Sequence, residues 1–407
     1  MVTDAISSLR RWSLLGIALG ATLFANVFIN GTAFLIPTLD RDLGVGTDLA
    51  QAGLISAMPK FGMVFTLIPW GYLTDRLGER FVLWVGSALT AAASVAAAFS
   101  HSLLLMSVFF FLGGMAAASS NSASGRLVVG WFPPEQRGLA MGIRQTAQPL
   151  GVGLGALVIP GLAARYGAGP AMLFPAAVCA LAAVVCLFAV TDPPRPPRSE
   201  APAADLANPY RGSSTLWRIH AVSVLLVVPQ ALLWTFTLVW LIAERGWSPT
   251  SAGVLVTVSQ ILGALGRIAA GRWSDRVGLR LQPIRIIAAV AATTMALLAL
   301  TDALDSGWSV ALMLVASVIT VTDNGLAFTA IAEIAGPFWS GRALGAQNTS
   351  QLLATGLTPP LFGALIGTAG YPAAFALCAL FPVLAIPLVP ADQPGGPTQP
   401  RESGQPV

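Results

Sequence analysis

The chain alternates long apolar runs with short polar connectors over almost its whole length. A helix needs about 20 apolar residues to cross the roughly 30 Å of hydrocarbon in a bilayer. Only helices and closed barrels satisfy the backbone there, and continuous apolar runs exclude the alternating pattern of barrel strands. The pattern therefore predicts an all-α membrane protein with twelve transmembrane helices, at 13–37, 51–73, 81–99, 103–127, 139–163, 169–190, 216–242, 250–271, 283–301, 308–333, 342–367 and 372–390.

The predicted helices form two sets of six, separated by one polar stretch. This stretch is rich in Pro, Ala and Arg, a composition typical of a solvated linker. We therefore expect an N-terminal six-helix half at 1–190, a cytoplasmic linker at 191–214, a C-terminal six-helix half at 215–390 and a cytoplasmic tail at 391–407.

Composition agrees with a membrane protein and argues against other classes. The 407 residues are 55% hydrophobic and 10% charged, whereas soluble domains are about 25% charged. The net charge of +4 does not indicate a nucleic-acid partner, because the arginines lie in the connectors and report membrane topology. Cys179, Cys186 and Cys378 lie inside apolar runs, which favours packing roles over a metal site or disulfides. We expect no metal and no cofactor.

The charges of the connectors predict the orientation. Arginines mark every second connector, and acids mark the others. Since positive connectors stay on the cytoplasmic side, both termini are expected in the cytoplasm. The Ala- and Arg-rich composition favours the plasma (inner) membrane of a bacterium. The arginines are Arg76, Arg80, Arg137, Arg195, Arg198, Arg276, Arg280 and Arg342, and the acids are Asp40, Asp42, Asp48, Asp302 and Asp305.

A ten-residue motif, G-x-x-x-D-R-x-G-x-R, occurs twice between apolar runs. The second copy follows the first by 200 residues. Its first glycine permits close helix packing, its second glycine turns the chain, and its arginines favour the cytoplasmic side. Its aspartate suits a latch against the N-terminus of a neighbouring helix or against an arginine. The motif residues are Gly71, Asp75, Arg76, Gly78 and Arg80, and then Gly271, Asp275, Arg276, Gly278 and Arg280.

A second internal match supports a duplication. The segment 140–148 in the fifth predicted helix aligns with 343–351 in the eleventh, at an offset of 203 residues. The chain therefore reads as two copies of one six-helix design.

The decapeptide resembles the signature loop between helices 2 and 3 of the major facilitator superfamily of transporters. The resemblance covers Trp12 to about Pro390. It implies two halves that rock about a midplane substrate site. It also implies that the two motifs are cytoplasmic latches, with Asp75 facing the N-terminal end of helix 11. No phosphate loop or hydrolase motif occurs, so we expect neither an enzyme nor an ATP-driven pump.

Two cations stand out at membrane depth, where charge is costly and usually functional. Lys60, the single lysine, lies about 13 Å below the outer end of its helix and aligns with neutral Gln260. It is either a cavity cation or the partner of a buried acid. Arg144 aligns with Gln347 and, with Gln145 and Gln148, suits bidentate recognition of a carboxylate. Alternatively it belongs to a cytoplasmic charge network, to which we assign Arg126 and Arg137.

Asp323 is the principal carboxylate at membrane depth, beside Asn324. Burial favours the protonated form of a carboxyl, so Asp323 is a candidate for proton coupling. A fixed counter-ion or a packing role is the alternative. The two cations fall in the N-terminal half and this acid in the C-terminal half, which favours an anion site with a separate proton site.

Neutral polar residues complete the candidate substrate site. Amides in buried helices also act as ordinary contacts between helices. The candidates are Asn26 and Asn30 on helix 1, Gln230 and Trp234 on helix 7, Gln260 on helix 8, and Asn348 and Gln351 on helix 11.

These observations predict a secondary active transporter that moves a small organic or inorganic anion with a proton by alternating access. The stretch that begins at Arg144 is similar to members grouped with cyanate and sugar-phosphate permeases. One alternative is a drug:proton antiporter, although Gly155 to Pro160 misses the usual antiporter spacing by one residue. The other alternative is a non-transporting receptor or scaffold. The expected partners are a small-molecule substrate, protons and the lipid bilayer, with no nucleic acid, and we expect a monomer.

Overall fold

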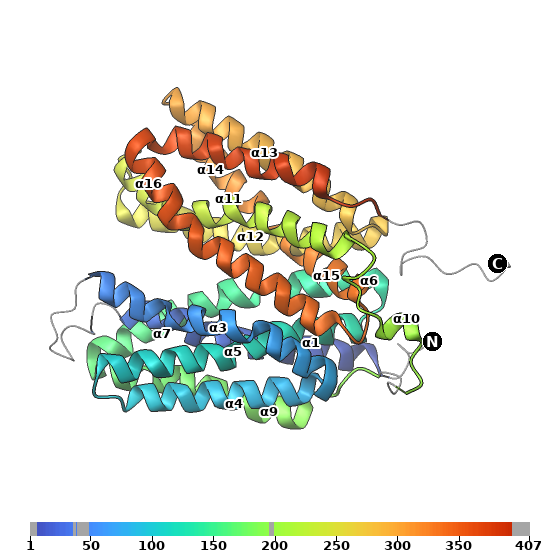
Figure 1. Ribbon diagram of the computed structural model, residues 1–407. Coiled ribbons are helices and arrows are strands. Elements are labelled where there is room, and N and C mark those ends of the chain that lie inside the picture. The colour runs from blue at the N-terminus through green and yellow to red at the C-terminus, as the bar shows by residue number, and fades with distance from the viewer. Residues whose placement is uncertain (1–5, 36–37, 39–48, 195–198, 393–407) are drawn as a thin grey trace. The chain divides into compact units, whose positions relative to one another are not determined.

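The computed structural model describes residues 6–35, 38, 49–194 and 199–392. Over these residues the chain is helical and contains no strand (Figure 1). The expected connector charges Asp40, Asp42, Asp48, Arg195 and Arg198 lie outside the described residues, and so does the tail from residue 393.

The N-terminal half contains α1 to α9, and the linker contains α10. Their bounds are α1 (Ser8–Gly31), η2 (Thr32–Leu35), α3 (Leu49–Leu77), α4 (Glu79–Ala98), α5 (Leu103–Trp131), α6 (Pro134–Arg144), α7 (Ala147–Tyr166), α8 (Ala168–Ala171), α9 (Leu173–Ala189) and α10 (Ala203–Leu206). The Leu206 carbonyl accepts a hydrogen bond of 3.2 Å from Trp339 Nε1, so this part of the linker is docked rather than free in solvent.

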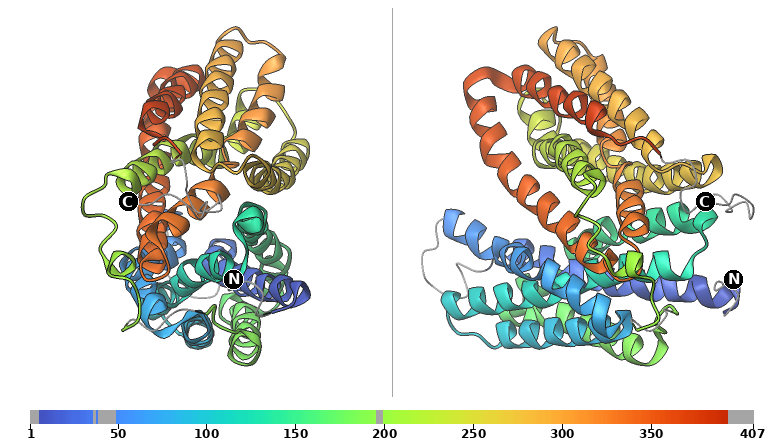
Figure 2. Two further views of the ribbon diagram at one scale, coloured as in Figure 1. Left: turned by 90° about the vertical axis from the view of Figure 1, so that its right-hand side faces the viewer. Right: turned by 45° about the vertical axis from the view of Figure 1, so that its right-hand side comes forward.

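The C-terminal half contains α11 (Thr215–Ala243), α12 (Pro249–Val277), α13 (Leu281–Ala303), α14 (Trp308–Ile319), α15 (Asn324–Ala335) and α16 (Ser340–Leu388). Counted over the described residues, 11 helical segments are long and apolar enough to span a bilayer. The last, α16, has 49 residues, about 73 Å of helix. It bends at Gly370, where φ is 79° and ψ is 173°, and so makes two passes (Figures 1 and 2). This division gives the twelve predicted helices.

In both motifs, more residues are helical than the sequence predicted. The predicted ends at 73 and 271 were wrong, because α3 continues to Leu77 and α12 to Val277. The motif aspartates therefore lie near the ends of helices, and only the last residues of each motif form the connector. Gly78 and Gly278 turn the chain with φ of 95° and 67°, as expected of the second glycine in each motif.

Two helices that were predicted to be continuous are interrupted. The fifth starts earlier than predicted, at Pro134, and splits into α6 and α7 at Gln145. One cause is local: a helical carbonyl at Gln145 would need the N–H of residue 149, and Pro149 has none. The tenth splits into α14 and α15 around Val321. Hydropathy could not reveal these breaks, because the residues at them are largely apolar or neutral.

Contacts divide the chain into two compact units that follow the predicted halves except for one exchanged segment each. Unit 1 contains Met1–Trp131, Thr146–Ala207 and Ala335–Thr349, and unit 2 contains Phe132–Gln145, Asn208–Ile334 and Ser350–Val407. Each exchanged segment packs through glycines. A Cβ atom on Gly71 would lie 2.2 Å from the Gly341 carbonyl oxygen in unit 1, and one on Gly271 would lie 2.1 Å from the Gly138 oxygen in unit 2. A side chain at Gly71 or Gly271 would therefore separate the two backbones.

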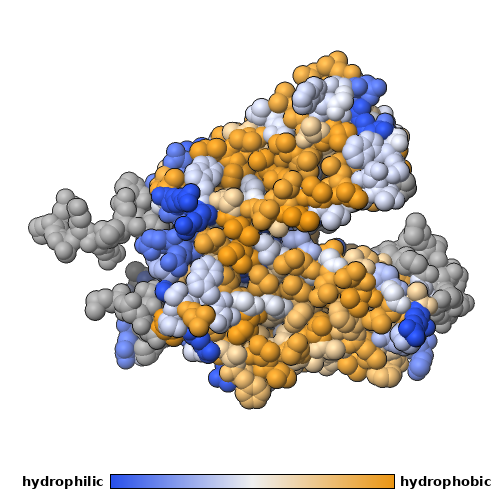
Figure 3. Space-filling view, turned by 180° about the vertical axis from the view of Figure 1, so that it is seen from behind, coloured by the Kyte–Doolittle hydropathy of each residue, from blue (hydrophilic) through white to orange (hydrophobic). Residues whose placement is uncertain are grey.

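Large apolar side chains fill each unit and also cover its surface. In unit 1, Phe28 and Phe110 pack edge to face with centroids 6.2 Å apart, and in unit 2, Trp240 and Phe375 do so at 6.2 Å. The three cysteines are buried free thiols, which agrees with their predicted packing role. In Figure 3, hydrophobic side chains cover the middle of the visible face and hydrophilic ones gather toward the ends. This distribution fits a surface that faces lipid.

Candidate functional site

Asp75 binds the start of α16 within unit 1. Its carboxylate accepts hydrogen bonds from the backbone N–H of Gly341 at 2.8 Å and of Arg342 at 3.1 Å, and from Arg342 Nε at 2.9 Å. Because α16 begins at Ser340, the carboxylate lies at the positive end of that helix. This is the contact that the sequence predicted for Asp75, and we call it the first latch.

Arg126 of α5 supports the first latch from behind. Its guanidinium contacts Glu79 at 2.5 Å and Asp75 at 3.5 Å. It also donates to the Thr74 carbonyl at 3.1 Å and to Ser340 Oγ at 3.1 Å. One buried arginine therefore joins α3, α4, α5 and the start of α16. Its predicted place in a charge network is confirmed.

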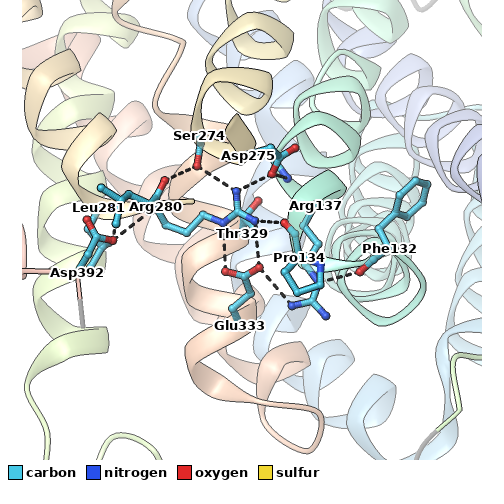
Figure 4. Close-up of polar contacts among 12 residues, drawn as sticks. Phe132, Pro134, Arg137, Ser274, Asp275, Arg280, Leu281, Thr329, Glu333 and Asp392 are labelled. Carbon is cyan, nitrogen blue, oxygen red and sulfur yellow. Dashed lines mark hydrogen bonds and ion pairs between the residues drawn. The ribbon is translucent and has the colours of Figure 1, made fainter. Parts of the chain in front are cut away.

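A second latch of similar design lies in unit 2 (Figure 4). Asp275 accepts hydrogen bonds from the N–H of Gly138 at 2.9 Å and of Leu139 at 2.8 Å on α6, and from Arg280 Nη1 at 2.7 Å. Arg280 also contacts Glu333 of α15 at 3.2 Å. Burial alone would lower the pKa of the Arg280 guanidinium, but the charges of Glu333 and Asp275 outweigh burial and raise it.

Arg137 extends the second latch, as the sequence predicted, by contacting Glu333 at 3.2 Å. The two latches differ in which element supplies the arginine and which supplies the glutamate. In the first, the arginine comes from α5 and the acid, Glu79, from the motif; in the second, the acid comes from α15 and the arginine, Arg280, from the motif. Each latch therefore joins its motif aspartate to an arginine and a glutamate, but the two residues come from different elements in the two latches.

The last arginine of the motif has different surroundings in the two copies. Arg80 is exposed and donates to the Leu187 carbonyl at 2.7 Å, whereas its counterpart Arg280 is the buried centre of a latch. The motif arginines Arg76 and Arg276 are exposed, and Arg76 lies 4.9 Å from the centre of the Tyr72 ring.

Two aspartates that sequence reasoning missed hold the helices that follow the motifs. Asp192 accepts from the N–H of Arg80 at 2.7 Å. Asp392 accepts from the N–H of Arg280 at 3.1 Å and of Leu281 at 2.9 Å. These acids also stand 200 residues apart, just after the last helix of each half, so the internal repeat would have revealed them. Asp392 begins the segment that we assigned to the cytoplasmic tail, and its carboxylate binds the start of α13.

A cluster of buried charge occupies unit 2 beside the interrupted helices. Arg267 of α12 is 3% exposed and Asp323 is 2% exposed. The two charges interact electrostatically. Arg267 donates to the Gln145 carbonyl at 2.9 Å and to the Val321 carbonyl at 3.3 Å, and it lies 5.9 Å from the centre of the Trp234 ring. Sequence reasoning missed Arg267, although a charge inside the apolar run 250–271 was the available signal.

Arg144 lies in the same unit and is 2% exposed. Its Nη1 donates to Gln145 Oε1 at 2.9 Å, and its guanidinium lies 5.9 Å from the centre of the Phe328 ring. Gln145 therefore contacts both guanidiniums, one through its side chain and the other through its carbonyl. Arg144, Arg267 and Asp323 together carry two positive charges and one negative charge. We call these three residues and Gln145 the buried charge cluster.

A chain of amides lies next to this cluster. Asn324 Nδ2 donates to Gln230 Oε1 at 2.9 Å, and Gln351 Nε2 donates to Asn324 Oδ1 at 3.0 Å. The structure thus brings together Gln230 of α11, Gln351 of α16 and the residue beside Asp323. Gln230 and Gln351 had been separate candidates in the sequence, whereas Asn324 had not been a candidate.

Most of the other candidates belong to unit 1. In unit 1, Lys60 and Gln148 are exposed. Asn26 and Asn348 donate to carbonyls one turn earlier, at 2.8 Å each. Asn30 donates to Asn26 Oδ1 at 3.4 Å, so these two residues share a helix face as predicted. Gln260 of α12 is partly buried in unit 2.

The predicted separation of cations from the acid does not hold. Arg267 is a buried cation of the C-terminal half, and Arg144 belongs to the same compact unit as Asp323. The prediction counted the charges of each half by sequence position. It overlooked Arg267 and could not foresee that the α6 segment packs with the C-terminal helices.

Comparison with known proteins establishes the family. The sequence profile of the Major Facilitator Superfamily matches residues 17–359. This chain belongs to the Major Facilitator Superfamily. An MFS-type transporter of Mycobacterium tuberculosis is 60% identical over 93% of this chain and 85% of its own length. The gallate transporter of Pseudomonas putida is 26% identical over 93% of this chain and 89% of its own.

The fold also matches solved members of the superfamily. The proton:xylose symporter XylE superposes with a TM-score of 0.75 over 94% of this chain and 95% of its own, at 16% identity. The protein is therefore a multi-pass membrane transporter of this superfamily and not an enzyme. The predicted fold class and family are confirmed.

Proposed function

We propose that the protein is a secondary transporter that moves a small organic anion together with a proton. The observation that carries this proposal is the buried charge cluster, in which two buried guanidiniums both bind Gln145 and share a compact unit with buried Asp323. Burying a guanidinium away from water costs several kcal/mol, and a bound anion would offset part of that cost. Arginine also matches the planar oxygen pair of a carboxylate through two parallel hydrogen bonds. We assign anion binding to Arg144 and Arg267, with Gln145 between them.

We assign the proton to Asp323. A carboxyl group removed from water favours its neutral form, and a second negative charge nearby increases that preference. An arriving anion would be repelled by ionised Asp323, so anion binding and protonation support one another. The amide chain of Gln230, Asn324 and Gln351 then supplies neutral hydrogen-bonding groups for the rest of the substrate.

The relatives are compatible with this assignment. Gallate, the substrate named for the Pseudomonas relative, is a carboxylate, and XylE is named as a proton symporter. An exporter of amphipathic cations is disfavoured because a substrate cation would meet two buried arginines. Lys60, Asn26, Asn30, Gln148, Gln260 and Asn348 stay candidates for the remainder of the substrate path.

The two latches are proposed as the parts that hold the cytoplasmic ends together and release during transport. Each places a carboxylate on a helix segment that packs with the other half's unit, at a glycine contact. We further propose that both termini are cytoplasmic, that the protein lies in a bacterial inner membrane, and that it works as a monomer.

Ligand-dependent thermal stability tests the function. Purified protein would be heated with gallate, a hexuronate, a sulfonate, inorganic phosphate and two amphipathic cations, each tested separately. A ligand at 100 times its dissociation constant stabilises the folded state by about 2.7 kcal/mol, which is detectable. We expect at least one anion to raise the midpoint, and Arg144→Gln to remove that shift. Stabilisation by the amphipathic cations alone would contradict the proposal and favour a drug antiporter.

Coupling is tested by uptake into proteoliposomes. We expect an imposed proton gradient, acidic outside the vesicle, to drive accumulation of the stabilising anion by wild type. Asp323→Asn should still exchange labelled for unlabelled anion but should not accumulate it against a gradient. Accumulation by Asp323→Asn equal to that of wild type would exclude Asp323 as the proton carrier.

A further inference from the structure

A hollow of about 550 Å³ lies in unit 2 where one connector joins α11 to α12 and another joins α13 to α14. We call it the connector hollow. Its α12 begins at Pro249 beside the hollow and ends 29 residues later at Val277 beside the second latch, about 43 Å away. The hollow therefore lies at the end of the unit opposite the latch. Its lining includes Arg245, Trp247, Leu255, Ser309, Val310 and Leu314.

Tryptophans place the connector hollow at the depth of lipid headgroups. Trp247 lines it, and Trp308, which is 71% exposed, begins α14 beside it. Tryptophan is enriched where hydrocarbon meets water. On α14 the lining extends from Gly307 to Leu314, about 10 Å of helix. The hollow therefore runs from a polar end into apolar side chains, as a site for a whole lipid would.

Arg245 stands at the polar end of the hollow with one donor unused. Its guanidinium forms ion pairs with Asp302 and, at 2.5 Å, with Asp305. Its Nε is buried and has no hydrogen-bond partner among the residues that the structure describes. An unpaired buried donor costs free energy, so a ligand oxygen bound to this guanidinium would stabilise the site. A phosphate supplies such an oxygen.

The surrounding charges select the kind of headgroup. The two connectors and the last turn of α13 carry three acids, Glu244, Asp302 and Asp305, against the single Arg245, a net charge of −2. This net charge repels a headgroup that carries only a phosphate. The side chain of Asp305 is 91% exposed, so it can bind a cation while it stays paired with Arg245. A headgroup with a phosphate and an ammonium therefore matches both signs of charge.

We infer that the connector hollow binds a phospholipid whose headgroup carries a phosphate and a primary ammonium, as phosphatidylethanolamine does. Arg245 binds the phosphate and Asp305 binds the ammonium. One acyl chain lies along Leu255 and Leu314. The bound lipid joins the α11–α12 connector to the start of α14. This site shares no residue with the buried charge cluster, so it does not depend on the proposed transport function.

Native mass spectrometry of the delipidated protein in detergent tests the site. Phosphatidylethanolamine, phosphatidylcholine and phosphatidylglycerol would be titrated separately. The first has an ammonium that donates hydrogen bonds, the second an ammonium without N–H groups, and the third no cation. A charge-assisted hydrogen bond is worth a factor of about ten or more in affinity. We therefore expect phosphatidylethanolamine to bind at least about tenfold more tightly than phosphatidylglycerol, with phosphatidylcholine between them.

Two variants each remove one feature of the site. Asp305→Asn removes the charge that binds the ammonium and should lose the preference for phosphatidylethanolamine. Asparagine tolerates the φ of 48° at this position, so the fold should persist. Ala311 is exposed and lines the hollow. Ala311→Phe fills the space, keeps every charge, and should abolish the tight binding.

Matched controls place the same changes elsewhere. Ala289→Phe adds the same ring at an exposed position of α13 outside the hollow, and Glu200→Gln removes an exposed acid of unit 1. Both should bind phosphatidylethanolamine as wild type does. Equal affinity of wild type for phosphatidylethanolamine and phosphatidylglycerol would overturn the choice of headgroup. Phosphatidylethanolamine affinity in Ala311→Phe equal to that of wild type would overturn the site.

A second measurement locates the lipid without changing the hollow's charges or filling it. Trp247 lines the hollow, so a lipid bound there with brominated acyl chains should quench its emission. The emission of Trp247 is the difference between wild type and Trp247→Phe. Brominated phosphatidylethanolamine should quench this difference more strongly than brominated phosphatidylglycerol does. No quenching by the brominated phosphatidylethanolamine would overturn the site, whatever the mass spectra show.

Discussion

Removing the Arg126 guanidinium should destabilise unit 1 far more than an ordinary surface substitution would. The side chain of Arg126 is 5% exposed, and those of Asp75 and Glu79 are 0% exposed. Arg126→Gln would leave both carboxylates in place without the arginine that joins them. Removing one partner of a buried ion pair costs about 3–5 kcal/mol. The Arg342 bond to Asp75 persists, so we place the loss near the middle, at about 4 kcal/mol.

The second substitution isolates the ion pair from the other bonds of Arg126. Glu79→Gln combined with Arg126→Gln removes the partner charge but still loses the bonds to the Thr74 and Pro337 carbonyls and to Ser340 Oγ. Each lost hydrogen bond costs about 1 kcal/mol, so the double variant should lie about 3 kcal/mol below wild type. The double variant should therefore be more stable than Arg126→Gln alone, with a coupling of about 1 kcal/mol plus the cost of Glu79→Gln. Thermal unfolding in detergent, followed by tryptophan emission, would supply the four midpoints of the cycle.

A variant of the first latch with the two charges swapped tests the ion pair more strictly than the double removal does. The second latch has its acid on α15 and its arginine in the motif, and Arg126→Glu/Glu79→Arg would give the first latch the same arrangement. We expect this variant to be more stable than either of its single substitutions. Additive effects, with coupling near zero, would refute the reasoning, because they would mean that Arg126 contributes by packing rather than by charge.

Three further predictions concern the first latch and the single lysine. Asp75→Asn should keep ligand affinity close to that of wild type but lower the transport rate several-fold, since its bonds to the start of α16 are weakened. Loss of ligand binding in a folded Asp75→Asn protein would contradict the latch role. Gly341→Ala should lower stability by about 1–3 kcal/mol, because its Cβ would lie 2.4 Å from the Gly71 carbonyl oxygen, whereas Gly356→Ala, with no atom within 4 Å, should be tolerated in the same melting experiment. Lys60→Gln should leave the melting temperature nearly unchanged, since Lys60 is exposed. The same substitution should weaken anion binding if Lys60 lies on the substrate path. Anion affinity equal to that of wild type would remove Lys60 from the candidates.

The sequence by itself determined the number of spans, the duplication and the contact of Asp75. Span number follows from hydropathy, because every segment that crosses a bilayer needs a long apolar run whatever its neighbours are. The repeated motif predicted the turns at Gly78 and Gly278, since a tight turn with positive φ needs glycine at that position. The position of Asp75 followed from a resemblance and from the preference of a carboxylate for a helix N-terminus.

Only the tertiary structure decided which charges meet. Arg280 reaches Glu333 across 53 positions of sequence, and Arg126 reaches Glu79 across 47. No local pattern encodes such a pair, because it depends on which helix faces meet after packing. The helix interruptions beside Gln145 and Val321 are likewise stable because Arg267 of another helix takes up their carbonyls. A buried charge and a broken helix each cost free energy alone, and tertiary contact lets them stabilise one another.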